Sequence, residues 1–522
     1  MTFPTEFLHN LPREFLGEVR TDPYSRLLYS TDASIYQIEP LAVVFPHTRE
    51  DVQMVVSACA RECVPILARG AGSALAGQAV GRAVVLDFSR HLNRVLEVNA
   101  EERWARVEPG VVCDLLNNHL QPYGLQYGTD PASANRATLG GIVGNNSTGA
   151  HSLLYGMTAD HVLEADVVLS DGSTARFAAQ PYDAPLPAGD SFAARLHREV
   201  ADIAAHNAAA IRASYPRTWR NSSGYRLNYL LPEGGYVATR PSGWLQAQYP
   251  VVNGFNLAQL MAGSEGTLAV LNEIKVDLVP RPPRTVLGIL QFDSIAAACD
   301  ATPTILETEP SAVELIDDMI IRLTRNVPAY NRMLTFVEGI PAAVLIVEYY
   351  GATDAELLAK LDRLEARIAG MDSSARPGRV SHAVSAAEQG RVWGVRKVGL
   401  GLLMSVKGDA KPIPFIEDAA VPVQSLGDYV RAVERLFAEH GVSAGIYAHA
   451  SAGCLHIRPL INTKSRPQIE TMHAIARSVL ELMAKMGGAM TGEHGDGLAR
   501  SAFNKPLFGE EVYQAFCDVK RA

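Results

Sequence analysis

The spacing of apolar and polar positions predicts alternating strands and helices from about residue 46 onwards. Thr48 and Asp51 have the spacing of a capping box, and the apolar positions that follow predict a helix to about Glu62. Residues 191–213 show the same helical period. Short apolar runs bounded by turn residues predict strands at 64–68, 83–87, 162–169 and 268–278. The first 40 residues are more polar and predict a partly helical lead-in.

A proline-rich stretch, RPPR at residues 281–284, predicts an extended linker to a second region of the chain. The pattern beyond it predicts strands at 285–292, 311–316, 342–350, 442–450 and 454–461. It also predicts helices at 294–308, 353–369, 424–439 and 466–486. This order favours an α+β domain with an antiparallel sheet.

Composition narrows the functional classes. The formal net charge of −9 over 522 residues argues against a nucleic-acid partner, which needs a large basic face. The six cysteines are scattered without a CxxC pair, so they predict reduced thiols in a cytoplasmic protein and no iron–sulfur site within these residues. No apolar run approaches the roughly 20 residues of a membrane helix, so no transmembrane segment is expected.

A glycine-rich loop at residues 69–77 (RGAGSALAG) lies between two predicted strands. Glycines let backbone N–H groups approach a pyrophosphate, and a curled run of such groups forms an anion site. Taken alone, the loop is better explained as an ordinary connection, because the third glycine of the G-x-G-x-x-G fingerprint is missing and no helix clearly starts there.

Two later segments change that interpretation. Residues 128–149 are nearly all small or amide-bearing, with the motifs GTDPAS, ATLGG and NNSTG, and residues 263–269 read GSEGTLA. In this order the three segments resemble the FAD-binding domain of the vanillyl-alcohol-oxidase fold over about residues 40–280. The resemblance implies FAD bound non-covalently, with His151 as the nearest candidate for covalent attachment. It places Arg69, Gly70, Ala71, Gly72, Ser73, Ala74 and Gly77 at the pyrophosphate, Pro131, Ser133, Thr138, Gly140, Gly141 and Gly149 along the flavin, and Glu265 and Val270 toward the adenosine.

Histidines and a glutamate form a second group of candidates. His449 and His456 lie on either side of a small turn in a predicted hairpin, and Glu493 and His494 follow in the motif GEHGDG, expected at the end of a strand. Opposed strands bring both hairpin imidazoles to one side, and two histidines with a carboxylate suit a divalent metal. Any one of these histidines alone is more simply explained as a packed sheet residue.

The same motifs resemble the D-2-hydroxy-acid dehydrogenase branch of the flavin family, which includes enzymes that oxidise D-lactate, D-2-hydroxyglutarate and glycolate. The resemblance implies His449, His456 and Glu493 as metal ligands and His494 as the general base. Zinc is the first metal expected, with manganese, iron or cobalt as alternatives.

The carboxylate-binding residues follow from the same resemblance. The segment RVWGVRK matches a Trp-x-x-Arg helix and implies that Arg396 holds the substrate carboxylate. Arg458 stands where relatives have asparagine and is a candidate for a second carboxylate, which would favour D-2-hydroxyglutarate over D-lactate. Ile416 occupies the position of a family lysine, which Lys411 could replace. A solvated strand arginine and a loop lysine are the alternatives for Arg458 and Lys411.

The expected activity is oxidation of a D-2-hydroxy acid by hydride transfer to the flavin. An oxygen-using oxidase, a metal-dependent hydrolase with a vestigial nucleotide domain and a non-catalytic flavoprotein subunit stay open as alternatives. The electron acceptor is a quinone, an electron-transfer protein or an appended iron–sulfur domain; the last would bring the cluster that these residues lack. Location at the inner face of the membrane and a homo-oligomer are also left open.

The expected organisation has four parts. Residues 1–40 form the lead-in, 41–282 the FAD-binding domain, 283–488 the substrate domain with the metal-binding hairpin, and 489–522 a segment returning to the first domain. The last segment looks cut short, and its details resemble large members of the family with an iron–sulfur domain.

Overall fold

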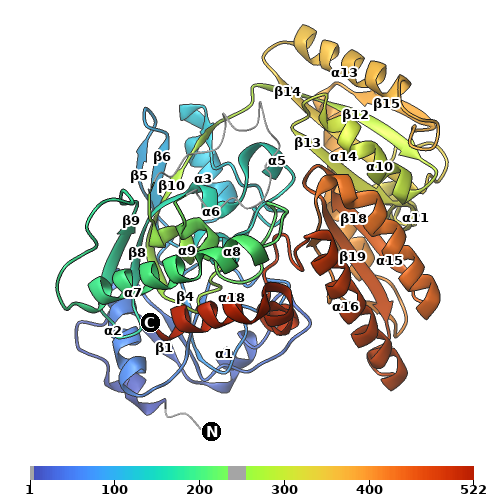
Figure 1. Cartoon of the computed structure of the whole chain (residues 1–522). Coiled ribbons are helices and arrows are strands. Elements are labelled where there is room, and N and C mark those ends of the chain that lie inside the picture. The colour runs from blue at the N-terminus through green and yellow to red at the C-terminus, as the bar shows by residue number, and fades with distance from the viewer. Residues whose placement is uncertain (1–4, 233–253) are drawn as a thin grey trace.

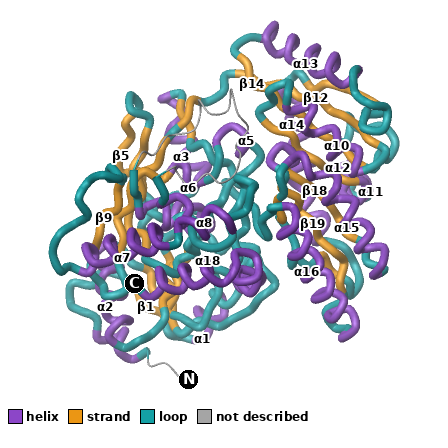
Figure 2. The backbone as a smooth tube through the Cα atoms, viewed as in Figure 1, coloured by secondary structure: helices purple, strands orange, loops and turns teal. Residues whose placement is uncertain are grey.

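The computed structural model describes residues 5–232 and 254–522, which form two halves lying side by side (Figure 1). Residues up to β10 (Val270–Asp277) build the N-terminal half, and residues from β12 (Arg284–Phe292) onwards build the C-terminal half. The last helix, α18 (Asn504–Arg521), returns to pack on the N-terminal half. In the C-terminal half helices flank the strands, whereas in the N-terminal half some strands lie at the outer edge (Figure 2).

The first sheet has four strands in the order β1-β2-β4-β3, and β2, β4 and β3 run parallel to one another. Its members are β1 (Glu18–Arg20), β2 (Ala42–Phe45), β3 (Ile66–Arg69) and β4 (Val84–Asp87). Helix α2 (Arg49–Arg61) packs on it and begins at the predicted capping box, because Thr48 Oγ1 accepts from Asp51 N at 3.1 Å. The polar lead-in does more than was expected, since it supplies the edge strand β1.

The second sheet is antiparallel in the order β5-β6-β10-β8-β9. The other strands are β5 (Val95–Asn99), β6 (Trp104–Val107), β8 (Val162–Val168) and β9 (Thr174–Ala178). The helix predicted at 191–213 is two helices, α7 (Phe192–His206) and α8 (Ala208–Ser214). The break falls at Asn207, whose backbone leaves the helical region at ψ 10° while its side-chain amide donates to Ile203 O.

The C-terminal half is one large antiparallel sheet in the order β15-β12-β14-β13-β18-β19-β16, with β17 also paired to β19. This confirms the predicted α+β class. The strands are β13 (Ala312–Asp317), β14 (Ala343–Gly351), β15 (Arg379–Ala383), β16 (Lys411–Pro412), β17 (Ala419–Ala420), β18 (Ala444–His449) and β19 (Cys454–Ile461). One face carries α10 (Ile295–Leu306), α13 (Asp354–Ala369), α15 (Leu426–His440) and α16 (Arg466–Met486), and the other carries α11 (Asp318–Arg325) and α14 (Ala386–Met404).

Shorter elements connect these parts. They are α1 (Pro23–Leu28), α3 (Cys113–Leu120), β7 (Leu125–Gln126), α4 (Leu139–Asn145), α5 (Ser152–Tyr155), α6 (Thr158–His161), α9 (Leu257–Met261), β11 (Val279–Pro280), α12 (Pro328–Asn331) and α17 (Gly497–Arg500). The strand expected before Glu493 is reduced to one bridge between Ala420 and Ala489, so Glu493 and His494 lie in a loop. Within the described ranges, no helix is long and apolar enough to cross a membrane.

Candidate active site

A cavity of about 710 Å³ is lined by residues of both halves. The N-terminal half contributes the glycine-rich loop, the segment of small residues around α4 and the turn at 264–266. The C-terminal half contributes the C-terminal part of α14 together with His449, His456, Glu493 and His494. The candidate cofactor residues and the candidate metal ligands therefore line the same cavity.

Most of the predicted cofactor residues line this cavity. They are Arg69, Gly70, Ala71, Gly72, Ser73, Ala74, Pro131, Ser133, Thr138, Gly140, Gly141 and Glu265. Gly77, Gly149 and Val270 do not line it. A Cβ on Gly149 would lie 1.9 Å from Asp130 O, and Val270 is buried in the core, so packing explains both residues.

Close backbone packing gives the glycine-rich wall its shape. A Cβ on Gly70 would lie 2.0 Å from Thr138 Oγ1, and Gly72 adopts a φ of 65°, which disfavours a side chain. Arg69 donates to the carbonyl oxygens of Tyr29, Thr31 and Ala79, so its guanidinium ties the loop to the lead-in. The resulting wall of backbone and small side chains suits an extended dinucleotide such as FAD.

Glu265 has a different setting from the one expected on the adenosine side. Its carboxylate accepts from the backbone N–H groups of Asp496 at 2.6 Å and Gly497 at 3.0 Å, just after His494. Gln78 and Asn145 donate to the carbonyl oxygen of His494 at 2.6 and 3.1 Å. The N-terminal half thus holds the backbone that carries the candidate base.

The three imidazoles converge on a single oxygen. Hairpin strands β18 and β19 place His449 opposite Cys454, two residues before His456, so both imidazoles share one face, as expected. The Nε2 atoms of His449, His456 and His494 lie 3.4, 3.2 and 3.4 Å from Glu493 Oε1. Ligand atoms arranged tetrahedrally around a zinc ion are about 3.3 Å apart, so this spacing fits a divalent cation.

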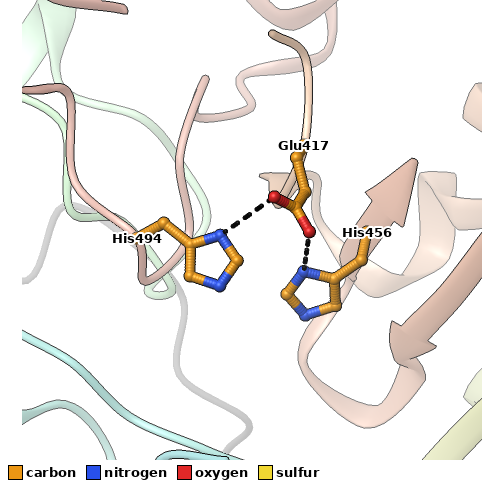
Figure 3. A group of neighbouring side chains, drawn as sticks. All are labelled: Glu417, His456 and His494. Carbon is orange, nitrogen blue, oxygen red and sulfur yellow. Dashed lines mark ion pairs between the residues drawn. The ribbon is translucent and has the colours of Figure 1, made fainter. Parts of the chain in front are cut away.

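Carboxylates face the opposite ring nitrogens. His449 Nδ1 lies 2.7 Å from Glu314 Oε1. Glu417 lies between the other two rings, 3.7 Å from His456 Nδ1 and 3.5 Å from His494 Nδ1 (Figure 3). Glu314 can hold the proton on Nδ1 of His449 and leave its Nε2 lone pair for a metal. Glu417 is too far from the other two Nδ1 atoms for a hydrogen bond and acts on those rings through its charge.

Charge around the rings shifts their pKa values. Burial lowers the pKa of His494, but the carboxylates of Asp418 and Glu417 outweigh it and raise the pKa to about 10. The pKa of His449 is likewise raised, since Glu314 outweighs its burial. Burial raises the pKa of Glu314, but His449 and Arg396 outweigh this and lower it to about 2, so the carboxylate stays ionised.

The predicted arginines have partners that the sequence did not indicate. Arg396 lines the cavity, yet its Nη2 lies 2.7 Å from Glu314. Arg458 is 1% exposed, does not line the cavity and donates from Nε and Nη2 to Glu417 at 2.7 and 2.6 Å. The Arg458 guanidinium thus pairs with Glu417 outside the cavity lining, and a role for Arg458 in substrate binding stays a prediction.

Two other candidates lie outside the cavity lining. Lys411 is exposed on β16, and its ammonium donates to Val406 O. His151 lies between Asp130 of the N-terminal half and Glu348 of the C-terminal half, at 2.6 and 2.5 Å. The His151 imidazole thus joins the two halves rather than lining the cavity.

Sequence reasoning missed Arg220 entirely. This arginine is fully buried, and its Nη2 donates to Glu493 Oε2 at 2.6 Å while Nη1 donates to Gly149 O at 2.8 Å. Its only sequence signal is a basic residue in the stretch TWRNSSGY, which is rich in hydroxyl-bearing residues. Arg500 was also missed, and its Nη1 lies 2.6 Å from Asp418 Oδ1.

The fold and the cavity define a flavin-binding oxidoreductase. Residues 40–178 match the FAD binding domain family, and residues 281–522 match the C-terminal domain family of FAD linked oxidases. The chain belongs to these FAD-linked oxidases, and the predicted family is confirmed.

Among curated proteins, the chain is 33% identical to D-2-hydroxyglutarate dehydrogenase of Escherichia coli K12, over 99% of this chain and 50% of that protein. It therefore spans about half the length of such relatives. It is 26% identical to the glycolate oxidase subunit GlcD of Bacillus subtilis, over 95% of this chain and 89% of that subunit.

Solved structures show the same fold. p-Cresol methylhydroxylase matches with a TM-score of 0.66 at 14% identity, over 96% of this chain and 91% of that chain. Alkyldihydroxyacetonephosphate synthase matches with a TM-score of 0.59 at 17% identity, over 98% of this chain and 84% of that chain. The vanillyl-alcohol-oxidase type of fold is confirmed.

Proposed function

We propose that the protein oxidises a D-2-hydroxy acid to the 2-oxo acid, with FAD as the hydride acceptor. The observation that carries this proposal is the convergence of three imidazole Nε2 atoms and one carboxylate oxygen in the cavity that also has the glycine-rich wall. One wall suits a dinucleotide, and the other suits a substrate with a carboxylate and a neighbouring hydroxyl.

His449, His456 and Glu493 would hold a divalent metal. Their ligand atoms lie within 4.8 Å of one another, and all three residues are buried. Nitrogen and oxygen ligands at this spacing suit zinc first, with manganese, iron or cobalt as alternatives. A bound cation would supply Lewis acidity that orients the substrate and lowers the pKa of its hydroxyl.

His494 is the proposed general base. Its side chain is 16% exposed, compared with 7% for His449 and 2% for His456, so it is the most accessible of the three from the cavity. The backbone contacts from Gln78, Asn145 and Glu265 fix its position. A cation bound beside the ring would lower the pKa that Asp418 and Glu417 raise, and the neutral Nε2 would then take the hydroxyl proton as the C2 hydride leaves for the flavin.

Arg396 is the proposed carboxylate-binding residue. Its Nε and Nη2 are directed to Glu314, which leaves Nη1 for the substrate. With Arg458 paired to Glu417, the preference for D-2-hydroxyglutarate over D-lactate rests on the similarity to D-2-hydroxyglutarate dehydrogenases. The acceptor for the flavin electrons would be a quinone, an electron-transfer protein or an iron–sulfur domain.

A dye-linked turnover assay tests the proposal. The FAD-loaded chain should reduce an artificial acceptor with D-2-hydroxyglutarate or D-lactate and fail with the L enantiomers. When oxygen is the only electron acceptor, the chain should produce little hydrogen peroxide with the same substrates. Rapid peroxide formation would instead favour an oxidase, and no turnover with any 2-hydroxy acid would overturn the substrate class.

A further inference from the structure

Every carboxylate that faces the imidazoles has an arginine of its own. Among the described residues, four carboxylates lie 2.7 to 3.7 Å from a ring nitrogen of His449, His456 or His494. The pairs are Glu314 with Arg396 at 2.7 Å, Glu417 with Arg458 at 2.6 Å, Asp418 with Arg500 at 2.6 Å and Glu493 with Arg220 at 2.6 Å.

All eight side chains are buried or nearly so. The most exposed carboxylate is Glu493 at 9%, and the most exposed arginine is Arg396 at 13%. The partners also come from distant parts of the chain, such as Arg220 and Glu493, which are 273 residues apart. An unpaired charge at such depth is strongly destabilising, so pairing is a condition for burying these carboxylates at all.

The consequence for the site is a balance of charge. In a metal site, nearby carboxylates without cationic partners offset part of the positive charge of the bound cation. Here four negative and four positive side chains cancel, and His449 and His456 would carry no charge while they coordinate the cation through Nε2. A divalent cation at this position would therefore keep its two positive charges for the ligand in the cavity.

We propose that this neutral shell makes the site selective for ligands that present two negative charges to the imidazole face, with Arg220, Arg458 and Arg500 acting as positioning residues. For a 2-hydroxy acid the two charges are the carboxylate and the oxygen whose proton has passed to His494 Nε2. The O–H bond breaks and an N–H bond forms, so the charge stays balanced. This inference rests on the divalent metal of the proposed function.

The pair Glu417 and Arg458 offers the cleanest test, because Arg458 does not line the cavity. Arg458→Gln leaves Glu417 uncompensated, so zinc should bind more tightly and the dianion oxalate more weakly. Glu417→Gln leaves Arg458 uncompensated, so both effects should reverse. Adding or removing one unit charge beside the site should change each affinity on the order of tenfold.

Two further variants separate charge from structure. The double variant Glu417→Gln/Arg458→Gln restores neutrality and should return both affinities to within about threefold of the unmodified chain. Arg458→Lys keeps the charge but loses the two-pronged contact, and it should bind oxalate like the unmodified chain. If Arg458→Gln fails to fold, the Glu417→Gln single and the double variant still test the sign.

The measurements use the FAD-loaded chain. Zinc affinity is measured by competition with a chromogenic chelator, and oxalate affinity by its perturbation of the flavin spectrum with zinc saturating. Opposite shifts in the two single variants would support the neutral shell. If the unmodified chain binds zinc but both single variants change the zinc and oxalate affinities in the same direction, the neutral shell is overturned. If the unmodified chain binds no divalent metal, the metal in the proposed function is overturned instead.

Discussion

The two walls of the cavity consist of different kinds of residues. The N-terminal wall consists largely of backbone, glycines and small side chains, and its tightest point is the contact between Gly70 and Thr138. The C-terminal wall consists of imidazoles whose carboxylate neighbours are paired with arginines. The first wall is therefore sensitive to added volume, and the second is sensitive to changes in charge or in proton acceptors.

The largest effect is expected at the base on the charged wall. His494→Ala should lower kcat by about 10²- to 10⁴-fold, because a positioned general base contributes that much. Its FAD content should stay near one per chain, since the glycine-rich wall is unchanged. The measurement is dye-linked turnover beside the flavin-to-protein absorbance ratio.

His197→Ala is the matched control for that variant. His197 is also buried, but it packs against Phe177 and Phe255 in the N-terminal half. Its turnover per flavin should stay within about threefold of the unmodified chain. Equal activity of the His494→Ala chain would remove His494 from the role of base.

Added volume on the backbone wall should act on the cofactor. Gly70→Ala places a methyl group 2.0 Å from Thr138 Oγ1, so the loop must shift and FAD affinity should fall by about tenfold or more. Gly144→Ala is the control, because that glycine also lines the cavity but has nothing within 4 Å of its added Cβ. FAD affinity is measured by reconstitution of the deflavinated chain; equal affinities of the two variants would contradict the comparison.

A smaller effect is expected where the two halves meet. Burial lowers the pKa of His151, but Asp130 and Glu348 outweigh it and raise the pKa well above its ordinary value. A raised pKa stabilises the folded state fully below about pH 6.5, and this stability is lost as the pH rises through the folded pKa. His151→Gln should therefore cost about 1 to 3 kcal/mol of unfolding free energy at pH 6 and less at alkaline pH.

Denaturant unfolding of both chains across pH checks this prediction. His206→Gln is a suitable control, because that histidine is exposed at the end of α7 and contacts no carboxylate in the described part of the chain. A stability difference for His151→Gln that is constant with pH would show that the two ion pairs contribute nothing through charge.

The smallest effect is expected at Lys411. Its ammonium lies on the surface and contacts only Val406 O among the described residues, so Lys411→Ala should change kcat/KM by less than about twofold. A loss of tenfold or more would place Lys411 at the substrate in the loaded enzyme. Such a loss would also mean that charged residues outside the cavity lining contribute to substrate binding.

The two walls also differ in how well they could be predicted from sequence. The glycine motifs and the paired histidines are local, because short spacing along one loop or one hairpin fixes which atoms lie together. Glu314 and Arg220 gave no comparable signal, because each meets its histidine or glutamate only after distant segments fold together. Arg458 shows the limit most clearly, since its position near the cluster could be anticipated but its partner Glu417 could not.

Secondary structure was predictable for the same physical reason. The capping box at Thr48 and the apolar period of α16 are signals within one element, and both helices begin where expected. The break at Asn207 leaves the apolar period intact on either side, so the sequence predicted one helix there.

The central claim is that one cavity brings a flavin together with a metal-dependent site for a 2-hydroxy acid. Anaerobic addition of D-2-hydroxyglutarate to the FAD-loaded chain tests it most directly, when repeated after chelation and again after a divalent metal is restored. Bleaching of the flavin that the chelator abolishes and the metal restores is the predicted result. Bleaching of equal rate and extent in the chelated chain would contradict the claim.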